Sequence, residues 1–109
     1  MPPEAVIGDM DSLSEAARAA IPADRLIAVA EQDSTDFGKC LYATEAPYYV
    51  AVGFTGGRID HMLAVLSTML AFAQKAVCLI GEGEVAALVP GGKRFSVSQH
   101  VGATVSIYP

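Results

Sequence analysis

Apolar and polar residues follow one another along the chain in blocks that predict alternating strands and helices. Short apolar runs bounded by turn residues have the pattern of buried strands, and they occur at residues 5–7, 26–30, 48–54 and 76–80. Stretches with apolar residues at helical spacing occur at residues 14–20, 35–45 and 60–75. Strand and helix in alternation are typical of a parallel, doubly wound sheet with right-handed crossovers. We therefore predict a three-layer, mostly parallel, Rossmann-like α/β fold.

The first two predicted helices begin at residues that can cap them. A serine or threonine hydroxyl at a helix start accepts a hydrogen bond from an unpaired backbone amide. We expect Ser12 or Ser14 to cap the first helix, and Ser34 or Thr35 to cap the second.

The pattern changes after residue 81. The apolar runs at residues 84–89, 93–97 and 103–107 are short and are separated by turn residues, which predicts antiparallel strands. The Gly-Gly-Lys-Arg sequence at residues 91–94 resembles a phosphate loop, but we interpret it as the connection between two of these strands. The chain then divides into an α/β part, residues 1–82, and an antiparallel part, residues 83–109.

The composition indicates a folded, soluble protein. Of its 109 residues, 52% are hydrophobic and 17% are charged, which excludes disorder as the main state. A net charge of −5 gives no broad basic surface, so neither nucleic acid nor an anionic membrane is an expected partner. Cys40 and Cys78 are interpreted as small buried hydrophobes rather than a disulfide framework. With no signal-peptide pattern at the start, we predict a cytoplasmic protein.

The third predicted helix is apolar on nearly every side. Its apolar run, residues 62–73, is shorter than the ~20 residues that span a bilayer. One face can cover the sheet, but the opposite face also needs a cover. We therefore predict a homodimer.

Three short polar turns follow predicted strands, at residues 8–12, 32–36 and 55–61. In an open parallel sheet, ligands bind at the edge formed by the carboxyl ends of the strands. We therefore expect the three turns to converge on one site.

Two aspartates, Asp9 and Asp11, lie in the first turn. They are two residues apart, so an extended backbone would place both side chains on one face. We expect a turn, which Gly8 can supply, to bring both carboxylates to one ion. Such oxygen ligands suit Mg²⁺, which takes one or two carboxylates and completes its shell with water and phosphate. The alternative is an Asx-turn with a solvated second carboxylate.

The second turn is also acidic. Asp33 and Asp36 stand beside Ser34 and Thr35 at a predicted helix start, where such residues are equally expected as caps and as partners of the helix dipole. A second acidic turn at the same sheet edge favours a cation, because carboxylates that repel one another in a cleft are costly without one.

The third turn has the features of a phosphate site. Gly56, Gly57 and Arg58 combine unshielded backbone amides, a helix amino end and a guanidinium, all of which hold phosphate oxygens. The alternative is a glycine turn with a surface arginine. Asp60 is a candidate helix cap, metal ligand or partner of Arg58, whereas His61 is expected to be structural.

Together these motifs resemble the thiamin pyrophosphokinase family. The family's Gly-Asp-x-Asp-Ser pattern after an apolar strand matches residues 6–13, VIGDMDSL. Its Asp-x-Thr-Asp-x-x-Lys-Ala/Cys-Leu pattern matches residues 33–41, DSTDFGKCL. Its Gly-Gly-Arg-x-Asp-His-x-Leu pattern matches residues 56–63, GGRIDHML. The order and spacing of all three agree.

The resemblance implies transfer of diphosphate from ATP to the hydroxyl of thiamin, giving thiamin diphosphate and AMP. The implied Mg²⁺ ligands are Asp9, Asp11 and Asp36. The implied nucleotide or phosphate contacts are Gln32, Thr35, Gly56, Gly57 and Arg58. The implied catalytic residues are Asp11, Arg58 and Asp60, with Asp60 near the transferred group or thiamin.

The chain also departs from the family pattern. Members have a further strand and an Asp-Gly-Gly turn ahead of the first motif, and a β-rich second domain that helps to form the thiamin site across a dimer. Residues 1–82 would then be a nucleotide-binding catalytic domain lacking its first strand unit, and residues 83–109 the start of the thiamin-binding domain. A truncated chain or a shortened relative is expected. Two alternatives stay open, namely a non-catalytic nucleotide- or diphosphate-binding relative, and a diphosphotransferase for another alcohol.

Overall fold

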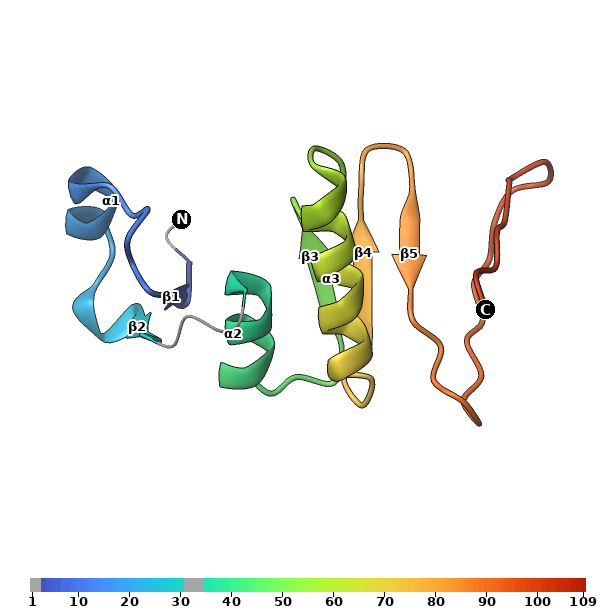
Figure 1. The fold of residues 1–109 in the computed structure, drawn as a ribbon, viewed down its shortest axis with the longest axis horizontal. Helices are drawn as coiled ribbons and strands as arrows, with labels where there is room; N and C mark the ends of the chain where they lie inside the picture. Colours follow the sequence, from blue (N-terminus) through green and yellow to red (C-terminus); the bar gives the residue numbers. More distant parts are fainter. Residues whose placement is uncertain (1–2, 31–34) are drawn as a thin grey trace.

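The computed structural model describes residues 3–30 and 35–109 as an elongated α/β arrangement of 47 × 29 × 26 Å (Figure 1). In chain order its elements are β1 (Val6–Gly8), α1 (Glu15–Ala20), the 3₁₀ helix η1 (Ala23–Arg25), β2 (Leu26–Ala28), α2 (Asp36–Ala43), β3 (Tyr49–Val52), α3 (Ile59–Ala71), β4 (Val77–Ile80) and β5 (Val85–Ala87). Every strand and helix predicted for residues 1–82 is present, although most are shorter than predicted.

The strands form two sheets rather than the single sheet that was predicted. β1 and β2 pair in parallel, with Ile7 opposite Ile27. β3 pairs in parallel with β4, and β4 pairs with β5 in antiparallel orientation. In the described chain no strand joins β1 to β3, and helix α2 lies between the two sheets (Figure 1). The predicted parallel pairing is therefore present within each half but does not continue across the molecule.

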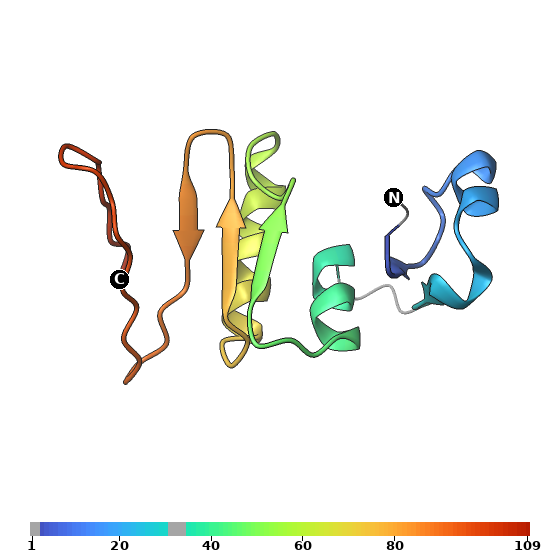
Figure 2. The same cartoon turned by 180° about the vertical axis from the view of Figure 1, so that it is seen from behind.

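The hydrophobic core lies between α3, α2 and the second sheet. The buried apolar residues are Phe37, Leu41, Ala51, Val65, Met69, Val77 and Leu79. Leu79 is fully buried, and Leu41 and Val65 are nearly so. Helix α3 lies across one face of β3 and β4 (Figure 1), and Figure 2 shows the other face of these strands from behind. Packing of α3 on the sheet is what was predicted for one of its faces.

The opposite faces of α3 and of the second sheet are exposed. On α3 the exposed apolar residues are Ile59, Leu63, Leu66 and Leu70, and on the sheet they are Val50, Val52, Ile80 and Val85. The second half of the chain therefore has two layers, one helix on one face of a sheet, where three layers were predicted.

Two helices are capped by residues that the sequence predicted as caps. The Ser14 hydroxyl accepts from the backbone amide of Ala17 at 3.2 Å, and the Thr35 hydroxyl accepts from the amide of Gly38 at 3.1 Å. Of the two candidates for the first cap, Ser14 is the one used. Ser34, the other candidate for the second cap, lies outside the described residues.

A cluster of polar side chains lies at the amino ends of β3 and β4. Lys75 Nζ donates to the backbone oxygen of Thr44 at 2.5 Å and to Glu45 Oε1 at 2.9 Å, and it lies over the Tyr49 ring. The Tyr49 hydroxyl donates to the same Thr44 oxygen at 2.9 Å. α3 ends at residue 71 instead of 75, and Lys75 contacts the end of α2 and the start of β3.

The prediction of strands at residues 93–97 and 103–107 is wrong. The chain after β5 turns at residues 100–103, where the Ala103 amide donates to the oxygen of His100, but neither arm forms a strand. Val97, Val105 and Ile107 are 61%, 73% and 88% exposed. A two-stranded hairpin is marginal unless one face packs on other structure, and these side chains have no such cover. Assignment of residues 83–109 to a second domain stays a prediction.

Both cysteines are free thiols at partly buried positions. Burial, assisted by the negative charge of Asp36, raises the pKa of the Cys40 thiol, so Cys40 is not an activated nucleophile. Across the described residues, no helix has the length and apolar character needed to cross a membrane.

Candidate active site

The turn after β1 presents its aspartates through an unusual backbone conformation. Met10 has φ of 69°, a left-handed value that is uncommon for a residue with a side chain and costs about 1 kcal/mol or more. The Asp11 amide donates to Asp9 Oδ1 at 3.0 Å, while Arg18 Nη2 from α1 donates to the Met10 oxygen at 3.3 Å. The predicted turn therefore exists: Gly8 has a positive φ of 159°, and Met10 is its left-handed residue.

Asp36, the first residue of α2, reaches the end of β1. Its Oδ1 lies 3.3 Å from the position that a Cβ on Gly8 would take, so a side chain at Gly8 would crowd the carboxylate. Asp9 and Asp36 line one small hollow of about 150 Å³, with Gly8, Met10 and Ser12 in its wall. One aspartate from each of the first two acidic turns therefore lines the same hollow.

Lys39 lies one helical turn after Asp36 and is the buried charged residue of the described chain, with 3% exposure. Its Nζ stands 4.0 Å from Asp9 Oδ2. A buried ammonium needs a negative partner to offset its desolvation, and the carboxylate at the end of β1 supplies one. A buried cation is thus paired with one of the two aspartates that line the acidic hollow.

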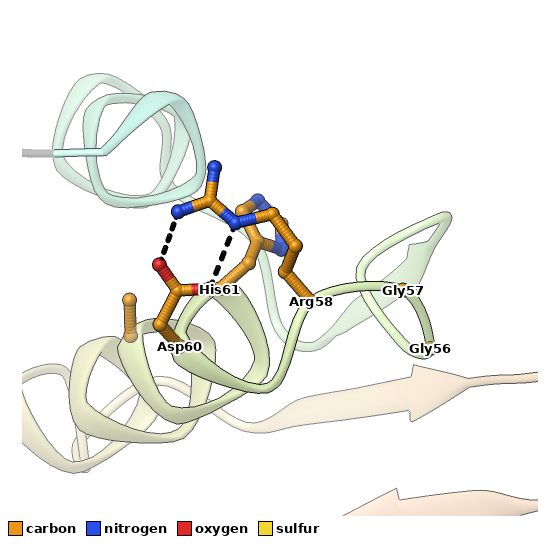
Figure 3. A pocket seen from close by; sticks show the side chains of 6 residues that line it. Gly56, Gly57, Arg58, Asp60 and His61 are labelled. Atoms are coloured by element: carbon orange, nitrogen blue, oxygen red, sulfur yellow. Dashed lines mark hydrogen bonds and ion pairs between the residues drawn. The ribbon is translucent and has the colours of Figure 1, made fainter.

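The third turn forms a second, larger hollow of about 390 Å³ at the start of α3, lined by Gly56, Gly57, Arg58, Asp60, His61 and Ala64 (Figure 3). Gly56 and Gly57 have φ of 79° and 68°, and a Cβ on either would meet no atom within 4 Å. Glycine is favoured here by backbone conformation and not by lack of space. The two consecutive left-handed residues leave the backbone of the turn open to solvent.

Arg58 and Asp60 form a bidentate ion pair (Figure 3). Arg58 Nε donates to Asp60 Oδ1 at 3.0 Å, and Nη2 donates to Oδ2. The side chains are 82% and 62% exposed. The hydrogen bond from Arg58 holds the pKa of the Asp60 carboxyl below its usual value. Of the three roles considered for Asp60, the structure shows that of partner to Arg58, and that of metal ligand stays a prediction.

The predicted residues divide between the two hollows. Asp9 and Asp36 share the first, whereas Arg58 and Asp60 share the second. Asp11 is exposed and does not line the first hollow, and Thr35 is used as the cap of α2. Among residues 3–30 and 35–109, no group of three or more acidic, histidine or cysteine side chains is placed to hold a metal.

Gln32 lies outside the described residues. The described residues of the three predicted turns do not converge in one cavity, but are divided between two hollows. The reason is topological, because β1 and β3 belong to different sheets and so do not end at a common edge.

No role was predicted for Lys39, although the residue lies within the second motif. A lysine three residues after Asp36 is on the same face of the helix, and that spacing was the available signal. The left-handed Met10 carried no signal, since methionine has no preference for this conformation.

Comparison with known proteins agrees with this arrangement of motifs. No curated protein matches the chain. The family described as "Thiamin pyrophosphokinase, catalytic domain" matches residues 1–80, which include every residue of both hollows. The chain therefore belongs to the thiamin pyrophosphokinase family.

Proposed function

We propose that this protein transfers diphosphate from ATP to the hydroxyl of thiamin, giving thiamin diphosphate and AMP, with Mg²⁺ as the metal. The observation that carries the proposal is that Asp9 and Asp36 line one hollow at the end of β1, within the family match over residues 1–80. Two carboxylates in one hollow suit Mg²⁺, which binds through one or two such groups and completes its shell with water and phosphate oxygens.

The residues of the first hollow would hold the metal. Asp9 and Asp36 are the ligands that fit, and the hydroxyl of Thr35 keeps its proton free to donate to a phosphate while its oxygen caps α2. Asp11, which is exposed beside the hollow, is proposed to act through water or after a change of the turn. Bound Mg²⁺ would neutralise charge on the phosphates.

The residues of the second hollow would hold the transferred group. Arg58 is exposed, so its guanidinium can exchange Asp60 for a phosphate oxygen. Gly56 and Gly57 have no side chains to shield the backbone amides of the turn. The released Asp60 carboxylate would then accept a hydrogen bond from the alcohol and orient it.

The reaction needs little beyond positioning and charge neutralisation. The thiamin hydroxyl oxygen attacks the β-phosphorus of ATP, the bond from that phosphorus to the α,β-bridging oxygen breaks, and AMP leaves. The hydroxyl proton is lost to Asp60 or to water. Asp60 is suited to orientation rather than to strong basicity, because a solvent-exposed carboxylate is a weak base.

The test is product analysis with Mg²⁺, ATP and thiamin. Equal amounts of AMP and thiamin diphosphate are expected, and release of ADP would refute diphosphate transfer. Calorimetry with Mg²⁺-ATP separates the alternatives, since binding without turnover indicates a non-catalytic relative. Turnover with pterins or other heterocyclic alcohols in place of thiamin would indicate a different acceptor.

We also propose that the protein is a homodimer that buries the exposed face of α3. Ile59, Leu63, Leu66 and Leu70 are 78%, 57%, 38% and 64% exposed and follow one another at spacings of four, three and four residues. This is the spacing of the apolar seam in paired helices, so two copies of α3 can pack along it.

Light scattering tests the dimer. Leu63→Glu or Leu70→Glu is expected to yield a monomer, because a charge in the seam would be buried without a partner. Val85→Glu is the matched control, since Val85 is similarly exposed, at 62%, but lies on β5. A monomeric wild-type protein would refute the proposal.

A further inference from the structure

The turn that carries Arg58 touches the end of the neighbouring strand at one glycine. Gly81 directly follows β4, and Thr55 follows β3, which pairs with β4 in parallel. A Cβ on Gly81 would lie 2.5 Å from Thr55 Oγ1 and 3.3 Å from Thr55 Cβ. The first distance is too short for any stable contact. Gly81 is not among the residues with positive φ, so lack of space is the reason for a glycine here.

The other glycines near this turn are different. A Cβ built on Gly53, Gly56 or Gly57 would meet no atom within 4 Å. Gly81 is therefore the glycine at which this turn packs closely against another part of the structure, through Thr55. Thr55 immediately precedes Gly56, so the place of its side chain sets where the turn begins.

Gly81 itself is in a fixed position. β4 is paired on both sides, by β3 and by β5. The Gly81 amide also donates to the oxygen of Glu84 at 2.9 Å and closes the turn to β5. A side chain at residue 81 would therefore displace its neighbours. Glu84, whose Cγ would lie 3.1 Å away, is flexible and exposed, so the larger displacement falls on Thr55.

We infer that Gly81 is a positioning residue for the turn Gly56–Arg58: its missing side chain lets Thr55 pack on the end of β4 and thereby sets the place of the Arg58 guanidinium. The inference rests on the proposed function in so far as the guanidinium holds the diphosphate. Displacement of a substrate-holding group by about 1 Å can cost up to about 100-fold in rate.

The experiment uses Gly81→Ala, Thr55→Ala and the double variant, with Gly91→Ala as the matched control. Gly91 has no positive φ, and a Cβ there would meet no atom within 4 Å. Thr55→Ala removes Oγ1, after which the remaining 3.3 Å approach needs only a small adjustment. The double variant should therefore behave like Thr55→Ala.

Two readouts are measured. The first is the rate at which trypsin cleaves after the exposed Arg58, which requires no activity. We expect Gly81→Ala to raise this rate about tenfold by loosening the turn, and the double variant to return to the rate of Thr55→Ala. The second is turnover, for which Gly81→Ala is expected to raise KM for Mg²⁺-ATP by about tenfold or more.

The outcomes separate this inference from the proposed function. Absence of turnover in the wild type refutes the function, while the trypsin series still tests the contact. Cleavage of Gly81→Ala at the Gly91→Ala rate, or a double variant no better than Gly81→Ala, overturns the inference. If Gly81→Ala does not fold, folding of the double variant supports the contact, and failure of both overturns it.

Discussion

Replacement of Lys39 by methionine removes the buried cation that pairs with Asp9 of the acidic hollow, while keeping the bulk of the side chain. Two unit charges 4.0 Å apart attract by about 4 kcal/mol at an effective dielectric constant of about 20. Asp9 is 26% exposed, so water replaces part of this attraction, and we expect a loss of about 1–3 kcal/mol in the free energy of unfolding. For a chain of this size that lowers Tm by roughly 5–15 °C.

Mg²⁺ should reverse much of this loss. Without Lys39, Asp9 and Asp36 repel each other across the hollow, and a bound cation removes that repulsion. The assay is thermal unfolding of wild type and Lys39→Met with increasing Mg²⁺, in which the variant is expected to gain more in Tm than the wild type. Ca²⁺ and Na⁺ provide the ion controls.

Lys75→Met is the matched protein control. Lys75 is also largely buried, at 14% exposure, and paired with a carboxylate, but it lies away from both hollows. Its loss should lower Tm without changing the response to Mg²⁺. Equal Mg²⁺ responses in Lys39→Met and wild type would refute the reasoning that places a cation between Asp9 and Asp36.

Four further results are expected. Arg58→Ala should lower kcat about 100-fold or more with Tm unchanged, because the side chain is 82% exposed; steady-state kinetics that match the wild type would remove Arg58 from the site. Asp60→Asn should bind inorganic diphosphate more tightly by calorimetry, since Arg58 loses its competing partner, yet turn over more slowly. Leu79→Ala, at a fully buried position, should cost about 2–5 kcal/mol in urea denaturation; a loss below about 1 kcal/mol would contradict the assigned core. The hydrogen bond to Glu45 raises the pKa of Lys75. This pair therefore stabilises the fold below the ordinary lysine pKa, and the stabilisation disappears as pH rises through the raised value. Glu45→Gln should lower Tm at neutral pH, and its difference in Tm from the wild type should shrink as the pH rises through the Lys75 pKa.

Much of the first 82 residues was predictable because local signals agree there. Ser14 and Thr35 cap helices at the places where the sequence put them, since a hydroxyl before an apolar periodic stretch serves that purpose in most contexts. Asp9 and Asp36 were expected to lie near each other because each follows a predicted strand, and they line one hollow.

The rest depends on interactions that no local pattern records. β1 and β3 lie in different sheets. Which strands pair with one another depends on their edges, and the residues of a strand do not by themselves specify its neighbour. Residues 103–107 alternate as a strand would, but a ladder also needs a surface on which to bury one face. The left-handed Met10 occurs together with contacts of Asp9 and Arg18 with the turn, and nothing in the properties of methionine predicts it.

Helix α2 connects these two halves, because its two sides have different partners. Asp36 and Lys39 face the end of β1, whereas Phe37 and Leu41 belong to the core beneath α3. A ligand that draws Asp36 toward Asp9 would therefore pull on the same rigid helix that carries part of the core. Occupancy of the acidic hollow and the alignment of the two sheets should then be thermodynamically linked, so that a cavity at Leu41 weakens metal binding from a distance and a bound metal makes the whole chain harder to unfold.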